Sequence, residues 1–240
     1  MKSIIIVGAS SGIGAELARQ FIGLGWRVGI ASRRTEPLMQ IAKLAPDRVF
    51  TAQIDVCDED APQHFKSLID KMGGIDVYLH STGIGHQNKE LTPQIEIDTL
   101  RTNGEGFVRM ITAAFNYFRE RGEGGHIAAI TSVAGTRGGG NAPAYSATKA
   151  MQSTYLQGLA QLSNTEGLKI SITDILPGFV ATPLIGDCPY PMVMGVEPVS
   201  RKIVRAILSR RRRVVIDWRY AMLIAVWKLI PRCVWERMKL

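Results

Sequence analysis

The stretch SIIIVGASSGIGAELARQFIG, residues 3–23, decides the fold. Its first five residues are mostly β-branched, which favours a strand, and a cluster of small residues with three glycines follows at once. The remainder has the length and the apolar content of a helix. A strand, a glycine-rich turn and a helix in this order predict the opening of an α/β unit.

The same alternation continues along the 240 residues, a length at which an α/β chain often forms one domain. Short apolar runs with the pattern of buried strands lie at 3–7, 27–32, 48–55, 76–81, 126–132, 169–176 and 213–218. Helix-length segments separate them at 12–24, 36–45, 60–72, 95–121, 143–166 and 197–209. This order predicts a single α/β domain of the doubly wound Rossmann type over residues 1–218, with a seven-stranded parallel sheet and helices on both faces. Residues 219–240 form an apolar, basic tail that we do not expect to be an independent domain.

The positive charge of the chain is concentrated at its C-terminal end. The net charge is +8, and residues 197–240 alone hold 12 Lys or Arg and 3 Asp or Glu. No recognised nucleic-acid motif accompanies these basic residues, so nucleic acid is not expected as a partner. The first residues lack the pattern of a signal peptide, which predicts a cytoplasmic protein. The three cysteines and four histidines show neither disulfide nor metal-ligand spacing, so no metal is expected.

Sheets of this kind bind ligands beyond the carboxyl ends of their strands. The first strand ends in GASSGIG, where glycine permits a tight turn and close approach of the backbone to a phosphate. The following helix offers free N–H groups at its start. The loop predicts dinucleotide binding, with an ordinary strand–helix turn as the alternative. The loop residues expected at the cofactor are Gly8, Ser10, Ser11, Gly12, Ile13 and Gly14.

Two arginines, Arg33 and Arg34, end the second strand, where NAD-selective sites place a carboxylate for the ribose 2′-hydroxyl. Arginine at this place can bind the 2′-phosphate of NADP through charge-assisted hydrogen bonds. The pair therefore predicts NADP(H), with a solvated basic pair as the alternative. After the third strand, Asp55 and Val56 lie where an adenine ring would be flanked.

Tyr145 and Lys149 stand four residues apart, and Pro143 before them suits the first turn of a helix. The two side chains would share one face of that helix. A phenol has a pKa of about 10 and exchanges protons poorly at neutral pH, but a nearby ammonium lowers that pKa. The pair is a candidate acid/base for an alcohol or a carbonyl, with Ser132 able to hydrogen-bond the same oxygen. A surface tyrosine and lysine on an amphipathic helix are the alternative.

Together these motifs resemble the short-chain dehydrogenase/reductase family, over residues 3–183. GASSGIG is similar to the family's cofactor loop, and YSATK is similar to its Tyr-x-x-x-Lys motif. Asn103 matches its helix asparagine, and Ser132 matches the serine at a strand end. PGFVAT, residues 177–182, looks like the segment that holds the nicotinamide carboxamide. Further cofactor residues implied by the resemblance are Gly83, Tyr145, Lys149, Pro177, Gly178, Val180 and Thr182.

The resemblance implies a role for each catalytic candidate. Tyr145 is the general acid/base, and Lys149 binds the nicotinamide ribose and lowers the pKa of Tyr145. Ser132 holds the substrate oxygen, and Asn103 positions a water in a proton relay behind Lys149. The implied activity is NADP(H)-dependent interconversion of a carbonyl and a secondary alcohol by hydride transfer. A 3-oxoacyl thioester and a free ketone or ketose are both open as substrates.

The chain departs from the family pattern after the fourth strand. The usual Asn-Asn-Ala-Gly is HSTG here, residues 80–83, and Val7 replaces the usual threonine before Gly8. We expect His80 to be structural and the local support of the site to be changed. A non-catalytic NADP(H) sensor or scaffold on the same fold is the alternative function. The presence of all four catalytic candidates favours an enzyme.

The substrate, the assembly and the tail leave more than one interpretation. Segments 83–89, 135–144 and 184–196 are expected to shape the substrate site. Family members are commonly homodimers or homotetramers built partly from the two long helices. The tail combines three tryptophans, basic residues and a short apolar run, which fits peripheral contact with a membrane. Packing against a second subunit or the core is the alternative.

Overall fold

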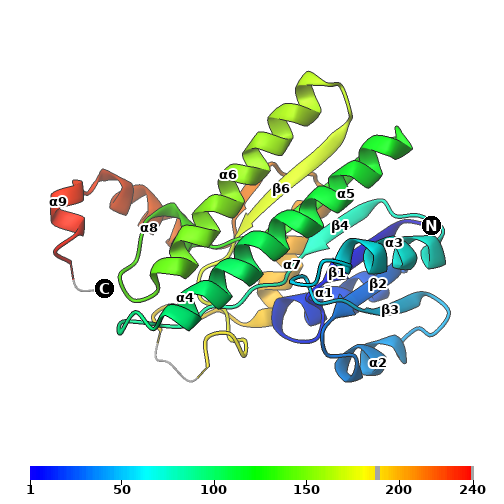
Figure 1. The fold of residues 1–240 in the computed structure, drawn as a ribbon, viewed down its shortest axis with the longest axis horizontal. Coiled ribbons are helices and arrows are strands. Elements are labelled where there is room, and N and C mark those ends of the chain that lie inside the picture. Colours follow the sequence, from blue (N-terminus) through cyan, green and yellow to red (C-terminus); the bar gives the residue numbers. More distant parts are fainter. Residues whose placement is uncertain (187–189, 239–240) are drawn as a thin grey trace.

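The computed structural model describes residues 1–186 and 190–238. Its centre is a sheet of seven parallel strands in the order β3-β2-β1-β4-β5-β6-β7, with helices on both faces (Figure 1). The predicted fold class is confirmed. The strands are β1 Ser3–Val7, β2 Arg27–Ser32, β3 Val49–Gln53, β4 Val77–His80, β5 Gly125–Ile130, β6 Ile170–Leu176 and β7 Arg213–Val215.

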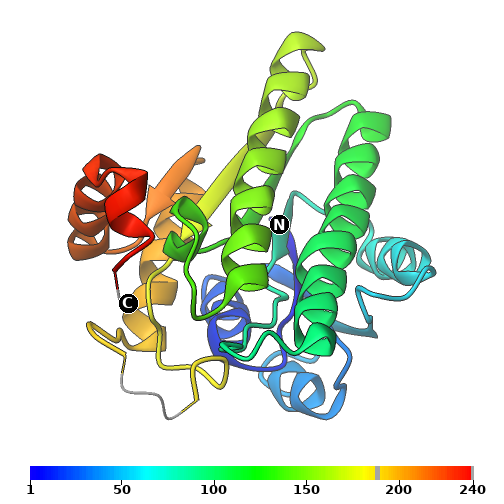
Figure 2. The same ribbon diagram turned by 60° about the vertical axis from the view of Figure 1, so that its left-hand side comes forward.

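The helices follow the strands in the order expected for right-handed crossovers. They are α1 Gly12–Gly23, α2 Glu36–Ala42, α3 Ala61–Met72, α4 Pro93–Leu100, α5 Phe107–Arg121, α6 Pro143–Thr165, α7 Val196–Leu208, α8 Trp218–Leu229 and α9 Arg232–Trp235. A π-helical segment, η1 Arg101–Gly106, joins α4 to α5, and a short 3₁₀ turn, η2 Val133–Thr136, follows β5. Helices α5 and α6 run side by side along the sheet in both views (Figures 1 and 2).

Strand β1 shows why both faces of the sheet must be covered. All five of its residues are buried, and its side chains alternate between the two faces. Ile4 and Ile6 belong to the core formed with α1 and α7. Ile5 and Val7 belong to the core formed with α3 and α5. A strand that is apolar on both faces therefore places the sheet between two helical layers.

Several elements end within three residues of their predicted bounds, and two differences bear on the site and the tail. The helix expected over 95–121 is interrupted by η1, which carries Asn103. The strand expected over 213–218 ends at Val215, because the chain turns into α8 at Trp218. The Asp217 side chain caps that helix by accepting a hydrogen bond from the Arg219 N–H at 3.0 Å.

Candidate active site

The loop between β1 and α1 makes a turn too tight for a side chain at two of its glycines. Gly8 has φ +95°, and a Cβ there would lie 2.6 Å from the carbonyl carbon of Ser81. A Cβ on Gly14 would lie 2.2 Å from the Gly8 carbonyl oxygen. Only glycine permits this close turn. Ser11 makes no side-chain capping bond with any residue that the structure describes, so the first N–H groups of α1 stay available to a phosphate.

Arg34 reaches across the same loop from the end of β2. Its Nη2 donates to Ser10 Oγ at 3.1 Å and to Ser11 Oγ at 3.4 Å. Arg33 points to the third strand instead, where its Nη1 lies 3.8 Å from Asp55 Oδ2. The two arginines are therefore not equivalent, and Arg34 adds its positive charge to the loop at the start of α1.

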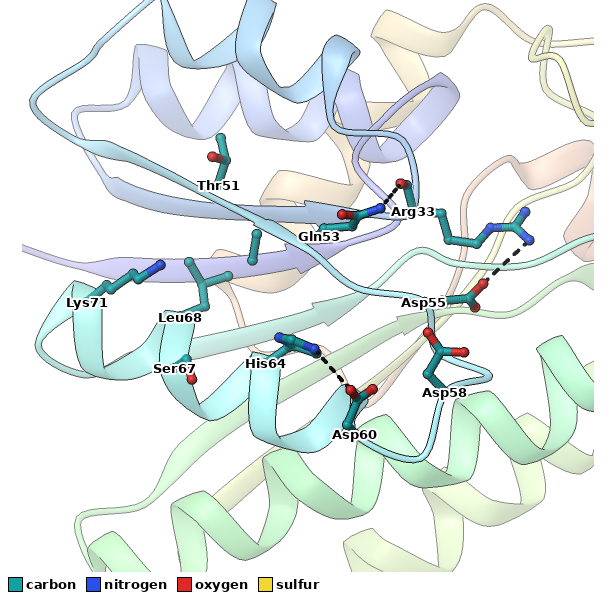
Figure 3. A pocket seen from close by; sticks show the side chains of 11 residues that line it. Arg33, Thr51, Gln53, Asp55, Asp58, Asp60, His64, Ser67, Leu68 and Lys71 are labelled. Atoms are coloured by element: carbon teal, nitrogen blue, oxygen red, sulfur yellow. Dashed lines mark hydrogen bonds and ion pairs between the residues drawn. The ribbon is translucent and has the colours of Figure 1, made fainter.

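An open groove of about 530 Å³ lies beside α3 (Figure 3). Arg33 and Asp55 line one end of it, and His64 and Lys71 lie farther along. None of the four catalytic candidates lines it. The groove therefore adjoins the predicted adenine end of the cofactor site and is not the place of the chemistry. Val56, the other residue predicted there, is buried next to Gly106.

Asn103 closes the loop that follows β4. Its Oδ1 accepts a hydrogen bond from the Ile84 N–H at 2.9 Å, and its Nδ2 donates to the Ile84 carbonyl at 2.7 Å. A Cβ on Gly83 would lie 3.3 Å from both Asn103 Oδ1 and Lys149 Nζ. The π-helical turn of η1 holds this buried asparagine, and such turns are frequent at functional sites.

Gln152, a residue that the sequence analysis missed, joins Asn103 to Lys149. Its Nε2 donates to the Asn103 carbonyl at 2.8 Å, and its Oε1 accepts from Lys149 Nζ at 3.1 Å. Lys149 Nζ also donates to the Ile130 carbonyl at 3.1 Å. The Gln152 side chain has an exposed fraction of 0%. Its position three residues after Lys149, on the same helix face, was the signal available in the sequence.

Ser132, Tyr145 and Lys149 converge at the carboxyl end of β5. Lys149 Nζ lies 5.7 Å from the centroid of the Tyr145 ring, and Gly85 packs against that ring, with 2.8 Å between its ideal Cβ position and Tyr145 Cδ2. Ser132 Oγ accepts a hydrogen bond from the Ala134 N–H at 3.1 Å. Three side chains with the predicted acid/base chemistry thus meet within one site.

Burial changes the proton affinities of this cluster. It raises the pKa of Tyr145 above its usual value, and a hydrogen bond with Ser132 opposes that rise. Burial lowers the pKa of Lys149 to about 8, against the opposing effect of Asp174. The lowering of the Tyr145 pKa by Lys149 therefore stays a prediction.

His80, the main departure from the family pattern, is completely buried at the end of β4. Its Nδ1 shares a hydrogen bond of 2.9 Å with the Tyr78 hydroxyl, and its Nε2 has no partner within the described part of the chain. Burial, assisted by the charge of Lys149, lowers the pKa of His80 to about 3. A backbone hydrogen bond with Thr82 opposes this lowering but does not cancel it, so the ring is neutral at physiological pH and acts through packing and hydrogen bonding.

The segment that follows β6, residues 177–182, runs from Ser132 toward the glycine loop between β1 and α1. The Pro177 carbonyl accepts a hydrogen bond from the Val133 N–H at 3.1 Å, next to Ser132. Val180 pairs with Met194 in an isolated bridge. A Cβ on Gly12 would lie 3.1 Å from Thr182 Cγ2. The predicted nicotinamide segment thus lies between the catalytic candidates and the glycine loop.

Helix α8 supports this segment from behind. The Tyr220 hydroxyl accepts a hydrogen bond from the Phe179 N–H at 3.1 Å and lies 3.2 Å from the Met192 carbonyl. The ring fills the space at Gly178, where a Cβ would lie 2.1 Å from Tyr220 Cζ. Residues 190–194 belong to the substrate loop predicted over 184–196, of which residues 187–189 lie outside the described residues.

The end of α8 and the last residue of α9 lie against the loop that follows Ser132. Arg137 Nη2 donates to the Ile230 carbonyl at 2.8 Å, and its guanidinium lies 4.6 Å from the Trp235 ring centroid. Trp235 Nε1 donates to the Gly138 carbonyl at 2.8 Å. One side of the tail therefore packs on two loops of its own domain. Nothing in the tail's sequence identified Tyr220 or Trp235 as the residues that do so.

Known proteins resemble this chain in sequence over most of its length. The family model described as short chain dehydrogenase matches residues 2–189. An uncharacterized oxidoreductase of Mycobacterium tuberculosis is 31% identical, over 96% of this chain and 95% of that protein. Farnesol dehydrogenase of Aedes aegypti is 30% identical, over 78% of this chain and 80% of that protein.

Solved structures share the fold at lower sequence identity. A short-chain dehydrogenase from Sphingobium yanoikuyae in complex with NADPH has a TM-score of 0.81 and 21% identity, over 100% of this chain and 97% of that one. A 3-ketoacyl-(acyl-carrier-protein) reductase from Brucella melitensis complexed with NADH has a TM-score of 0.81 and 22% identity, over 90% and 96%. The sequence matches and the shared fold agree: the chain belongs to the short-chain dehydrogenase family of oxidoreductases.

Proposed function

We propose that the protein interconverts a carbonyl and a secondary alcohol with NADP(H) as the hydride carrier. The observation that carries the proposal is the meeting of Ser132, Tyr145 and Lys149 beside the segment that returns to the glycine loop. Asn103 is the fourth catalytic candidate, and Gln152 links it to Lys149 by a hydrogen bond to the Asn103 carbonyl.

The residues around the glycine loop fit a dinucleotide, because Gly8 and Gly14 leave backbone space that a Cβ would fill. Arg34 supports NADP(H) over NAD(H), since its guanidinium lies where a 2′-phosphate beside Ser10 and Ser11 would be bound. The residues that would hold the cofactor are Gly8, Ser10, Ser11, Gly12, Ile13, Gly14, Arg33, Arg34, Asp55, Val56, Gly83, Tyr145, Lys149, Pro177, Gly178, Val180 and Thr182.

When bound, the nicotinamide would supply or accept the hydride. In the reductive direction Tyr145 gives its phenolic proton to the carbonyl oxygen, which becomes the alcohol hydroxyl. Ser132 donates a hydrogen bond to the same oxygen and polarises the carbonyl. Lys149 stabilises the resulting phenolate until a proton from solvent replaces the one transferred. The oxidative direction reverses each of these transfers.

The substrate is a small molecule, and the loops at residues 83–89, 135–144 and 184–196 would shape the site that binds it. The exposed side chains of Leu184 and Val193 favour an apolar compound, in keeping with the name of the farnesol dehydrogenase relative. An oxoacyl thioester and a free ketone both fit this description. Peripheral contact of the tail with a membrane is compatible with such a substrate.

A homodimer or homotetramer in the cytoplasm is part of the same proposal. Helix α4 exposes Ile97 and Leu100 next to the long helices, and burial of these side chains would favour subunit contact. No helix among residues 1–186 and 190–238 is long and apolar enough to cross a bilayer.

The test is an assay of purified protein that follows NADPH and NADH absorbance with a panel of ketones and 3-oxoacyl thioesters. We expect turnover of at least one apolar carbonyl with NADPH, and no turnover by the Tyr145→Phe variant. Tight NADPH binding without turnover of any member of the panel would favour the non-catalytic sensor.

A further inference from the structure

Helix α8 presents to solvent an apolar face that no residue in the described part of the chain covers. Trp218, Met222, Val226 and Leu229 have exposed fractions of 68%, 58%, 58% and 84%. Their spacing of three and four residues places them on one side of the helix, with the small, exposed side chains of two alanines beside them. We call these four residues the α8 stripe. Four large apolar side chains this exposed on one helix mark a binding surface.

Basic side chains border the α8 stripe. At about 100° per residue, Arg219 lies at one edge of the stripe and Lys228 at the other. Helix α8 contains no acidic residue, and residues 218–238 carry four basic side chains and one acidic side chain. Arg219 pairs with the buried Asp217 at 2.9 Å and Arg232 pairs with Glu236 at 2.6 Å, so within the described residues 218–238 the positive charge without an ion-pair partner lies on Lys228 and Arg237.

An anionic lipid surface matches both properties of this face. It offers an apolar interior to the stripe and negative headgroups to the bordering cations, and a tryptophan at the stripe's end suits the interface between them. The helix has 12 residues, about 18 Å, so it would lie in the plane of the membrane. A second copy of the helix would bring more cations and no carboxylate, which disfavours pairing of two α8 helices.

The opposite face of α8 holds the loops around the proposed site. Tyr220 bonds to residues 179 and 192, and Arg137 joins the end of α8 to the loop after Ser132. The views agree that α8 and α9 lie together at one end of the molecule, away from α2 and α3 (Figures 1 and 2). Docking of the stripe would therefore place the loops at 135–140 and 190–194 about 10 Å from the lipid, behind α8.

We propose that the α8 stripe binds an anionic membrane surface, and that the site behind α8 takes an apolar carbonyl or alcohol that is dissolved in that membrane. The identity of the substrate class rests on the proposed oxidoreductase function. The docking itself rests only on the exposure and charge of α8.

Binding is tested by flotation of the full chain with vesicles of phosphatidylcholine alone or mixed with phosphatidylglycerol, at low and high salt. We expect binding to the anionic vesicles at low salt, and a partition coefficient at least tenfold lower for the Met222→Asp/Val226→Asp variant. The matched control is Met39→Asp/Leu44→Asp, which alters two equally exposed apolar side chains near α2 and should bind like wild type. Wild-type protein that stays unbound at low salt would overturn the proposal, and a stripe variant that then changes the oligomeric state in light scattering would assign the stripe to a subunit contact.

The substrate class is tested with a long-chain methyl ketone dissolved in anionic vesicles and a short methyl ketone dissolved in water. The stripe variant should keep wild-type turnover of the short ketone and lose at least tenfold on the long one. An equal loss on both ketones, or no loss on either, would refute delivery from the membrane. Absence of wild-type turnover on both would count against the proposed oxidoreductase function, and the flotation result would still decide the docking.

Discussion

Lys149 Nζ donates a hydrogen bond of 3.1 Å to Gln152 Oε1, and both side chains are buried on one face of α6. A buried ammonium is costly unless it is hydrogen-bonded, and the two oxygens that serve Lys149 here are both neutral. Gln152 therefore orients Lys149 without neutralising it, while its Nε2 fixes the Asn103 carbonyl. The amide thus acts as a positioning group behind the proposed acid/base.

Replacement of Gln152 should change the pH profile of the enzyme in a direction set by the new side chain. Gln152→Leu removes an acceptor and should lower the pKa of Lys149 further, whereas Gln152→Glu adds a carboxylate and should raise it. Loss of a buried partner costs about 1–3 kcal/mol, so kcat/KM should fall roughly fivefold to a hundredfold in Gln152→Leu. The measurement is kcat/KM against pH for each variant.

The other groups that bear on Lys149 are Asp174 on β6, His80 on β4 and Tyr145 on α6, and they are unchanged in these variants. Gln157→Leu, an exposed change on the same helix, is the control and should keep the wild-type profile. If the two Gln152 variants move the profile in the same direction, the positioning role is wrong.

Tyr145→Phe should abolish turnover and leave the fold intact. The phenyl ring can keep its packing against Gly85, so only the hydroxyl is lost. General acid/base catalysis contributes about 10²–10⁴-fold, and kcat should fall by at least the lower figure. Cofactor affinity, measured by fluorescence titration, should stay near the wild-type value. Tyr155→Phe removes a hydroxyl from the same helix as a control, and near-native turnover of Tyr145→Phe would disprove the assignment.

The layers of the fold and the order of the motifs along the chain could be predicted from the sequence. Strands such as β1 are apolar on both faces. This pattern is typical of a parallel sheet that is covered by helices on both sides. The π-helical turn at Asn103 was not predictable in this way, because apolar spacing over 95–121 fits an uninterrupted helix. Gln152 was missed because a glutamine in a helix usually faces solvent.

The orientation of α8 in the tail could not be predicted from the sequence. Helix α8 is apolar nearly all round, so its sequence gives no preferred face. Only tertiary contacts decide that Tyr220 turns inward to Phe179 and Trp218 turns outward. Core packing therefore accounts for one side of the helix, and the other two interpretations of the tail, a lipid surface and a second subunit, concern its exposed side.

Arg34 should carry most of the preference for NADPH. Its guanidinium lies at the glycine loop, whereas Arg33 is directed to Asp55. Loss of a charge-assisted partner of the 2′-phosphate costs about 1.5–3 kcal/mol, so Arg34→Ala should weaken NADPH binding roughly tenfold to a hundredfold. NADH binding should be almost unchanged, and Arg33→Ala should have a smaller effect. Calorimetric titration measures each affinity, with the exposed Arg19→Ala on α1 as control. Equal wild-type affinities for NADH and NADPH would contradict the role of Arg34.

His80 should make the protein sensitive to acid. Its pKa is about 3 in the folded protein, because burial and Lys149 disfavour the charged ring, and near 6.5 in an unfolded chain. As the pH falls below 6.5, His80 binds a proton in the unfolded state but stays neutral in the folded state. The free energy of unfolding therefore decreases between pH 6.5 and about 3. At pH 5 this one group should cost about 2 kcal/mol. His126, with a pKa lowered by burial to about 4, adds to the loss in the same direction.

The test compares the free energy of unfolding in urea at pH 7 and pH 5. The His80→Asn variant can lose stability at both values, because the Tyr78 hydroxyl loses its partner. The loss of unfolding free energy between pH 7 and pH 5 separates the effect of His80 protonation from the effect of the lost hydrogen bond. This loss should be about 2 kcal/mol smaller in the variant than in wild type, because the unfolded variant has no ring to protonate at this position. His86→Asn, a change at an exposed histidine, should leave the wild-type difference unaltered. A His80→Asn protein that loses as much stability on acidification as wild type would show that the buried ring is not the acid-sensitive group.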